Sequence, residues 1–131
     1  MKLLVITGSL LVMLSIATGW LLVVRRYLAL SPVVKLIKDD GRLLKGHLEY
    51  PIMALLLFSF YAMNFDLPLY FVLPACVGAC TNPSLHCVLA IMPGVNRNAT
   101  SPFGVFSTLS FLLTTIGLGG MAGAVLYEVL R

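Results

Sequence analysis

Charged residues are scarce in this chain of 131 residues, and their scarcity defines the class of the protein. Asp, Glu, Lys and Arg together make up 11% of the chain and hydrophobic residues 60%, whereas an average soluble domain is about 25% charged. These figures exclude a water-soluble globular domain. They also exclude intrinsic disorder, which requires low hydrophobicity and high charge. The composition therefore predicts one integral membrane domain.

The sequence also lacks the motifs of several enzyme and transport classes. It has no glycine-rich phosphate loop, no Ser-His-Asp set and no paired carboxylates. It lacks the intramembrane charge series typical of ion channels and ion-coupled pumps. The three cysteines and two histidines do not show the paired-ligand spacing of a zinc site. We interpret the cysteines, Cys76, Cys80 and Cys87, as small packing residues.

Four long apolar stretches make up most of the chain, at residues 3–24, 48–65, 67–93 and 103–127. A membrane-spanning helix needs roughly 20 such residues, and backbone amides cannot stay unpaired in hydrocarbon. The sequence therefore predicts an all-α fold, a four-helix transmembrane bundle that forms a single domain over residues 1–131. The first stretch is longer than the apolar core of a signal peptide, so we expect it to be retained.

The charges concentrate in residues 25–47, which we expect to form a loop. Its six cations are too few for a nucleic-acid-binding surface, so we expect the lipid bilayer as partner and no nucleic acid. The positive-inside rule predicts that this loop is cytoplasmic, and with four spans the loop at 94–102 is cytoplasmic too. The glycosylation pattern at Asn98 would instead require a luminal loop; we favour the charge rule.

Two histidines are the main candidates for chemistry. His47 lies where the basic segment meets the second apolar stretch. A histidine at such a position has one of three roles: a metal or haem ligand, a proton carrier, or an interfacial residue that contacts headgroups. Tyr50 follows on the same helical face, which suits either a planar cofactor or ordinary packing. In the third stretch Asn82 and His86 lie one helical turn apart. They are interpreted either as the lining of a polar pocket or as groups that form hydrogen bonds between helices.

The residues around His47 resemble those of a known family. The segment 42–47, Arg-Leu-Leu-Lys-Gly-His, resembles the start of the second span in the styrene oxide isomerases and hydroxylaminobenzene mutases, which are small four-span membrane enzymes. Thr81-Asn82 resembles a Ser-Asn step in the third span of the isomerases. Residues 103–107, Phe-Gly-Val-Phe-Ser, resemble the start of their fourth span.

This resemblance implies a membrane isomerase with a bound cofactor. It implies a homotrimer that holds haem b near the membrane surface, with His47 as the iron ligand. Because Tyr50 shares a helical face with His47, we expect it to be a second cofactor-binding residue. The reaction it implies is the Lewis-acid opening of a small lipophilic epoxide to a carbonyl product. Asn82 and His86 are the catalytic residues we expect, since Asn82 is retained and His86 stands where the isomerases have a tyrosine.

Departures from the family pattern leave other functions open. Gly78 stands where the isomerases carry an acid, and Met53 where they carry an asparagine. The alternatives are a metal-free mutase of the same fold and a non-catalytic membrane subunit or assembly protein. Such a subunit would pack through the small-residue patterns of the fourth stretch, which include Gly119 and Gly123. Glutathione-dependent membrane enzymes resemble the chain at residues 42–45, but its third and fourth stretches lack arginines to bind glutathione carboxylates.

Overall fold

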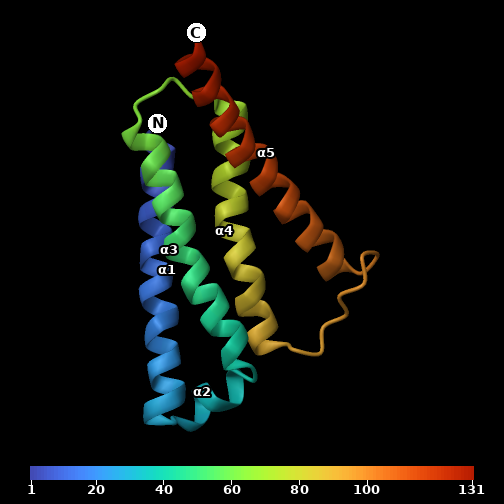
Figure 1. Cartoon of the computed structure of the whole chain (residues 1–131). Helices are drawn as coiled ribbons and strands as arrows, with labels where there is room; N and C mark the ends of the chain where they lie inside the picture. The colour runs from blue at the N-terminus through green and yellow to red at the C-terminus, as the bar shows by residue number, and fades with distance from the viewer.

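The computed structural model describes residues 1–131 and consists of helices and their connections, without strands (Figure 1). Four helical segments are long and apolar enough to cross a membrane. The predicted all-α, four-helix, multi-pass membrane fold is therefore confirmed. The elements in chain order are α1 (Lys2–Val23), the π-helical turn η1 (Val24–Leu28), α2 (Ser31–Leu36), α3 (Asp40–Ala62), α4 (Leu69–Ile91) and α5 (Pro102–Leu130).

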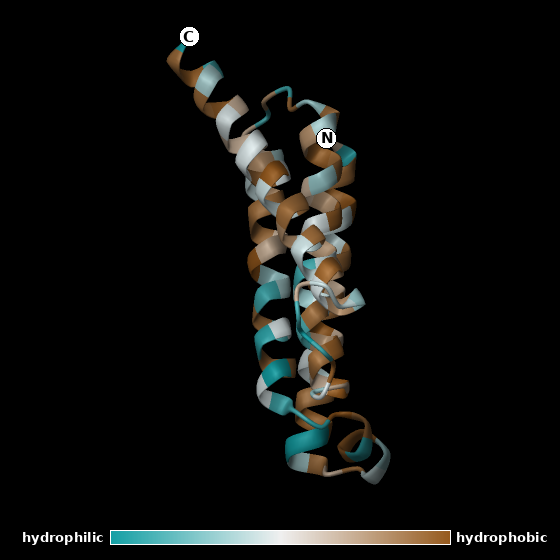
Figure 2. Ribbon diagram, turned by 90° about the vertical axis from the view of Figure 1, so that its right-hand side faces the viewer, coloured by the Kyte–Doolittle hydropathy of each residue, from teal (hydrophilic) through white to brown (hydrophobic).

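The two ends of the molecule differ in polarity. Both chain termini lie at one end, and α2 lies at the other, as expected for an even number of spans (Figure 1). Hydrophobic residues cover most of the long helices, and hydrophilic residues gather around the end that carries α2 (Figure 2). This polar end marks one membrane face of the protein.

The expectation of a loop over residues 25–47 is wrong for most of that segment. Helix α1 continues through Arg25 and Arg26 as η1 and ends before Ala29, whose φ of 47° breaks the helix. Arg25 and Arg26 both pair with Asp40, at 3.4 Å and 2.8 Å. These contacts fix the end of α1 against the start of α3.

Helix α3 begins at Asp40 instead of at Leu48, where the apolar stretch starts. Asp39 caps it, because its carboxylate accepts a hydrogen bond from the Arg42 amide at 3.0 Å. Leu43 is buried in this first part of the helix. Hydropathy detects only the part of a helix that suits hydrocarbon, so it misses polar turns that continue into the headgroup region.

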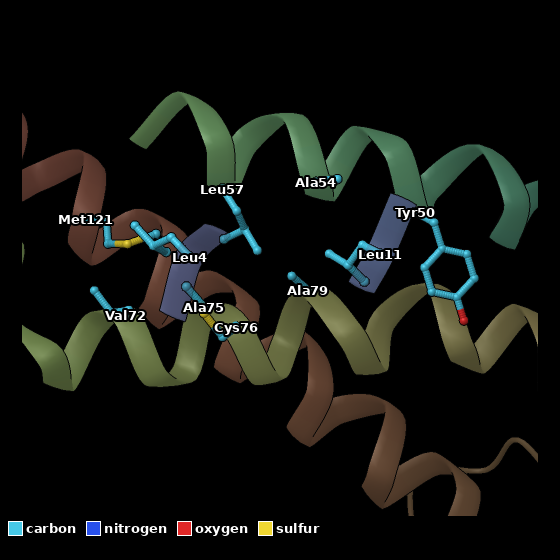
Figure 3. Close-up of a cluster of buried hydrophobic side chains, with 10 residues drawn as sticks. All are labelled: Leu4, Leu11, Tyr50, Ala54, Leu57, Val72, Ala75, Cys76, Ala79 and Met121. Atoms are coloured by element: carbon cyan, nitrogen blue, oxygen red, sulfur yellow. The ribbon is translucent and has the colours of Figure 1, made fainter. Parts of the chain in front are cut away.

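The helices pack in chain order, α1 on α3, α3 on α4 and α4 on α5. The core lies where α1, α3 and α4 meet, with Met121 of α5 at its edge (Figure 3). Alanines at the contact of α3 with α4 allow the two backbones to approach closely. The ten buried core residues are Leu4, Leu11, Tyr50, Ala54, Leu57, Val72, Ala75, Cys76, Ala79 and Met121.

Helix α5 packs mainly on α4, and the N-terminal end of α5 diverges from the other three long helices (Figure 1). Within this contact, the hydroxyl of Ser110 lies 2.6 Å from that of Thr81. Further along, Gly117 lies directly against the backbone of Ala75. On the same helix Gly119 and Gly123 have no neighbour within 4 Å of an added Cβ. The small residues of α5 thus lie on two faces of the helix. Within the chain, α4 covers the face with Gly117, and no helix covers the face with Gly119 and Gly123.

Candidate functional site

The His47 side chain lies between α3 and α1. Its Nδ1 is 2.9 Å from the carbonyl oxygen of Ser15 and 3.3 Å from the hydroxyl oxygen of Thr18. A backbone carbonyl can only accept, so Nδ1 carries the proton and donates it to Ser15. The other ring nitrogen, Nε2, then carries the lone pair. Fixing one nitrogen by a backbone hydrogen bond is how proteins orient a metal-binding histidine.

A proline in α3 explains why Ser15 lies at this position. Pro51 has no amide hydrogen, so the carbonyl of His47, four residues earlier, loses its partner within the helix. The hydroxyl of Ser15 donates to that carbonyl at 3.3 Å. Ser15 therefore binds His47 twice, once through the backbone of His47 and once through its ring. This double contact fixes the ring against α1.

His47 forms one wall of an outward-facing groove of about 420 Å³. Gly19 makes room for the ring, because a Cβ at this position would lie 2.9 Å from Cε1 of His47. Trp20 is 64% exposed and supplies a flat aromatic surface beside the histidine. The lining consists of Ile16, Gly19, Trp20, Val23 and His47. The groove is thus apolar apart from a single oriented imidazole.

Tyr50 does not line this groove. It is 3% exposed, and its ring points from α3 toward α4 (Figure 3). Its hydroxyl lies 2.9 Å from that of Ser84, which donates to the carbonyl of Cys80 at 2.7 Å. Three residues along an α-helix rotate a side chain by about 60° away from the first, enough to move Tyr50 from α1 toward α4. Its observed contacts are those of a core residue.

The second histidine lies at the contact of α3 with α4. His86 Nε2 is 3.1 Å from Oε1 of Glu49. The remaining polar atoms of the pair, Glu49 Oε2 and His86 Nδ1, are buried without a hydrogen-bond partner. Asn82 lies one turn before His86 on α4 and is half-buried.

The structure therefore separates the predicted site residues. From α3, His47 contacts α1, whereas Tyr50 and Glu49 contact Ser84 and His86 of α4. Neither Asn82 nor His86 lines the His47 groove. No group of three or more His, Cys, Asp or Glu side chains is placed to hold a metal ion with protein ligands alone. A group that needs only one protein ligand is the kind that His47 can bind.

Sequence reasoning missed the part of the groove that α1 supplies. Ser15, Thr18, Gly19 and Trp20 are not adjacent to any catalytic motif. A weak signal was present, because Gly8, Leu11, Ser15, Thr18 and Leu22 recur at three- and four-residue steps in the first span. That spacing marks a packing face, but it does not reveal the helix that packs there.

Comparison with protein-family models, with curated proteins and with solved structures finds no match.

Proposed function

We propose that this protein is a membrane-embedded isomerase that holds haem b through His47 and converts a small lipophilic epoxide to a carbonyl product. The observation that supports it is the His47 side chain. Its Nδ1 is fixed by Ser15, and it lies in an apolar groove that opens outward beside Trp20. The resemblance of residues 42–47 to the start of the isomerase second span points to the same residue.

The residues present fit a haem. Haem iron takes its ligands from the porphyrin and needs one protein ligand, which Nε2 of His47 supplies. No other side chain of the groove lining could coordinate iron, so His47 would be the one residue of the groove that holds a haem. When bound, the haem supplies a Lewis acid that polarises an epoxide oxygen without net oxidation or reduction.

The chain itself contributes orientation and a dry environment. The carbonyl of Ser15 holds the imidazole in one tautomer, and the hydroxyl of Thr18 lies beside the same ring nitrogen. Ile16, Trp20 and Val23 give the groove an apolar wall, which excludes water from a reaction that passes through a cationic carbon. Asn82 and His86 are left out of this step because neither side chain lines the groove, and Tyr50 is left out for the same reason.

The visible absorption spectrum tests the proposal. Protein purified in mild detergent from cells that make haem is expected to show a Soret band and to convert an aryl epoxide to the aldehyde. A colourless wild-type protein from such cells, which does not take up added haem, contradicts the proposal.

Replacing Gly19 by alanine is expected to weaken haem binding about tenfold, the size of effect typical of changes around a metal ligand. The new Cβ would lie 2.9 Å from Cε1 of His47 and would displace the ring. The dissociation constant is measured by haem titration at the Soret maximum. The matched control is Gly123→Ala in α5, where the added Cβ meets nothing within 4 Å. Equal affinities in the two variants would show that the ring position does not matter.

We also propose that the α2 end, and with it residues 94–102, faces the cytoplasm, because the six cations of residues 25–47 gather there. The Lys35→Cys variant is then expected to react with a membrane-impermeant maleimide only after cells are permeabilised. The Lys2→Cys variant, changed at the opposite end, is expected to react in intact cells. The reverse pattern would invert the topology and make glycosylation of Asn98 feasible.

A second candidate function is a non-catalytic membrane subunit. It is favoured by Gly119 and Gly123, which lie on α5 with no neighbour inside the chain. Close contact of helices through such glycines stabilises association in membranes. The same surface would serve the homotrimer that the isomerase resemblance implies, so oligomerisation alone does not separate the two functions. The absorption spectrum and the epoxide assay together do, since a colourless protein that converts the epoxide is a metal-free mutase, and a colourless protein without turnover fits the subunit.

A further inference from the structure

The end of the molecule that carries α2 holds all of the net charge of the protein. Residues 25–47 contain six Lys or Arg and two Asp, and the three cations and three carboxylates of the remaining chain cancel, so the net charge of +4 belongs to this segment. Figure 2 shows hydrophilic residues gathered at the same end. The proposed isomerase reaction uses none of these charges.

The two acids of this segment are already engaged within the protein. Asp40 pairs with Arg25 and Arg26. Asp39 accepts a hydrogen bond from the amide of Arg42 at the start of α3. These carboxylates therefore do not neutralise the other cations of the segment. The cations of the segment that form no ion pair are Lys35, Lys38, Arg42 and Lys45.

The segment that carries the lysines is fixed to the helical bundle. Ile37, directly after α2, is 1% exposed and packs in a buried cluster with Leu22, Leu43 and Ala90. The amide of Lys38 donates to the carbonyl oxygen of Ala90 at 2.8 Å. These contacts join the connection between α1 and α3 to the end of α4. The charged side chains thus extend from a backbone that is held in place.

Apolar side chains are exposed beside these lysines. Tyr27 is 81% exposed, and Leu30, Val34 and Leu36 are 50%, 41% and 51% exposed. A segment that lies in a bilayer surface buries such side chains at the acyl boundary and keeps its lysine ammonium groups among the headgroups. Tyrosine is enriched at the same depth. The composition of η1 and α2 therefore fits the surface of a membrane.

We propose that the α2 end is a binding surface for anionic phospholipids. The exposed ammonium groups of Lys35, Lys38 and Lys45 donate to the phosphate oxygens of the headgroup. The acyl chains of the lipid lie against the exposed apolar side chains of η1 and α2. A zwitterionic lipid fits less well, because its headgroup adds a cation that the lysines repel. The surface does not depend on haem, since none of these lysines lines the His47 groove.

The single tryptophan of the chain reports which lipids lie near this surface. Trp20 is 64% exposed and lies in the turns of α1 that precede η1. In mixed vesicles of phosphatidylcholine and phosphatidylglycerol, quenching of Trp20 fluorescence by brominated acyl chains on either lipid gives their relative binding constant. The ratio of the two measurements cancels any constant quenching by a bound cofactor.

We expect phosphatidylglycerol to bind about fivefold more strongly than phosphatidylcholine at low salt, the contribution of about one cation near an anionic surface. At 1 M salt the Debye length falls to about 3 Å, and the preference is expected to fall to about one. Lys35→Gln combined with Lys38→Gln is expected to lower the low-salt preference at least about twofold.

The matched control removes the same charge from the opposite end of the molecule. Lys2→Gln combined with Arg131→Gln is expected to leave the preference unchanged, which separates a local surface from an effect of net charge. If the Lys35 and Lys38 variant does not fold, the salt titration of the unchanged protein decides. The proposal is overturned if the wild-type protein does not prefer phosphatidylglycerol, if 1 M salt leaves the preference intact, or if the Lys35 and Lys38 variant retains it in full.

Discussion

The His47→Ala variant is expected to lose the Soret band that the haem-loaded wild-type protein shows. The other residues that line the groove, Ile16, Gly19, Trp20 and Val23, offer no group that coordinates iron. Changes around a metal ligand typically cost about 10- to 100-fold in affinity, so loss of the ligand itself is expected to cost more than about 100-fold. Haem titration of the apoprotein in detergent, followed by absorbance, measures this change.

His86→Ala is the matched control for this experiment. It removes the other histidine of the chain, whose Nε2 contacts Glu49 on the α4 side. We expect the Soret band to be retained, with an affinity within about twofold of wild type, since distant sites act nearly independently. If His86→Ala loses the band and His47→Ala keeps it, the haem ligand is His86, and the assignment of His47 is refuted.

The Gly117→Leu variant is expected to lose about 3 kcal/mol or more of unfolding free energy. At this position α5 lies directly on the backbone of Ala75, so even a Cβ would overlap α4. Backbone atoms cannot move aside as a flexible side chain does, and the two helices must separate. The expected loss is therefore at the upper end of the usual cost of overpacking. Denaturant titration in mixed micelles, followed by circular dichroism, gives the free energy.

Gly119→Leu introduces the same side chain two residues further along α5. A Cβ there meets nothing within 4 Å, and leucine favours helix over glycine by roughly 0.8 kcal/mol. We expect the unfolding free energy of the single chain to be unchanged or slightly higher. A loss equal to that of Gly117→Leu would show that α5 packs on α4 through a different face. Dissociation of an oligomer without unfolding would instead identify Gly119 as a subunit contact.

The number of spans and the polarity of the two ends follow from the sequence alone. Low charge and four apolar stretches are sufficient for this, because hydrocarbon admits only segments whose backbone bonds are internal. The helix ends were harder to predict. Helix α3, the second span, starts at Asp40 because Asp39 caps it. Capping depends on local hydrogen bonds that hydropathy does not measure. The two histidines marked positions where a polar side chain contacts a neighbouring helix.

What each histidine contacts was decided only by the tertiary structure. His47 and Glu49 are two residues apart on one helix, yet the first contacts Ser15 on α1 and the second His86 on α4. The sequence grouped Tyr50 with His47 and left out Trp20, because helical periodicity specifies which residues share a face but not which helix covers it. Interhelical contacts join residues far apart in the chain, and their geometry depends on where glycines and prolines let two backbones meet. The composition determined a four-span membrane protein; the packing of α3 between α1 and α4 placed its two histidines in separate sites.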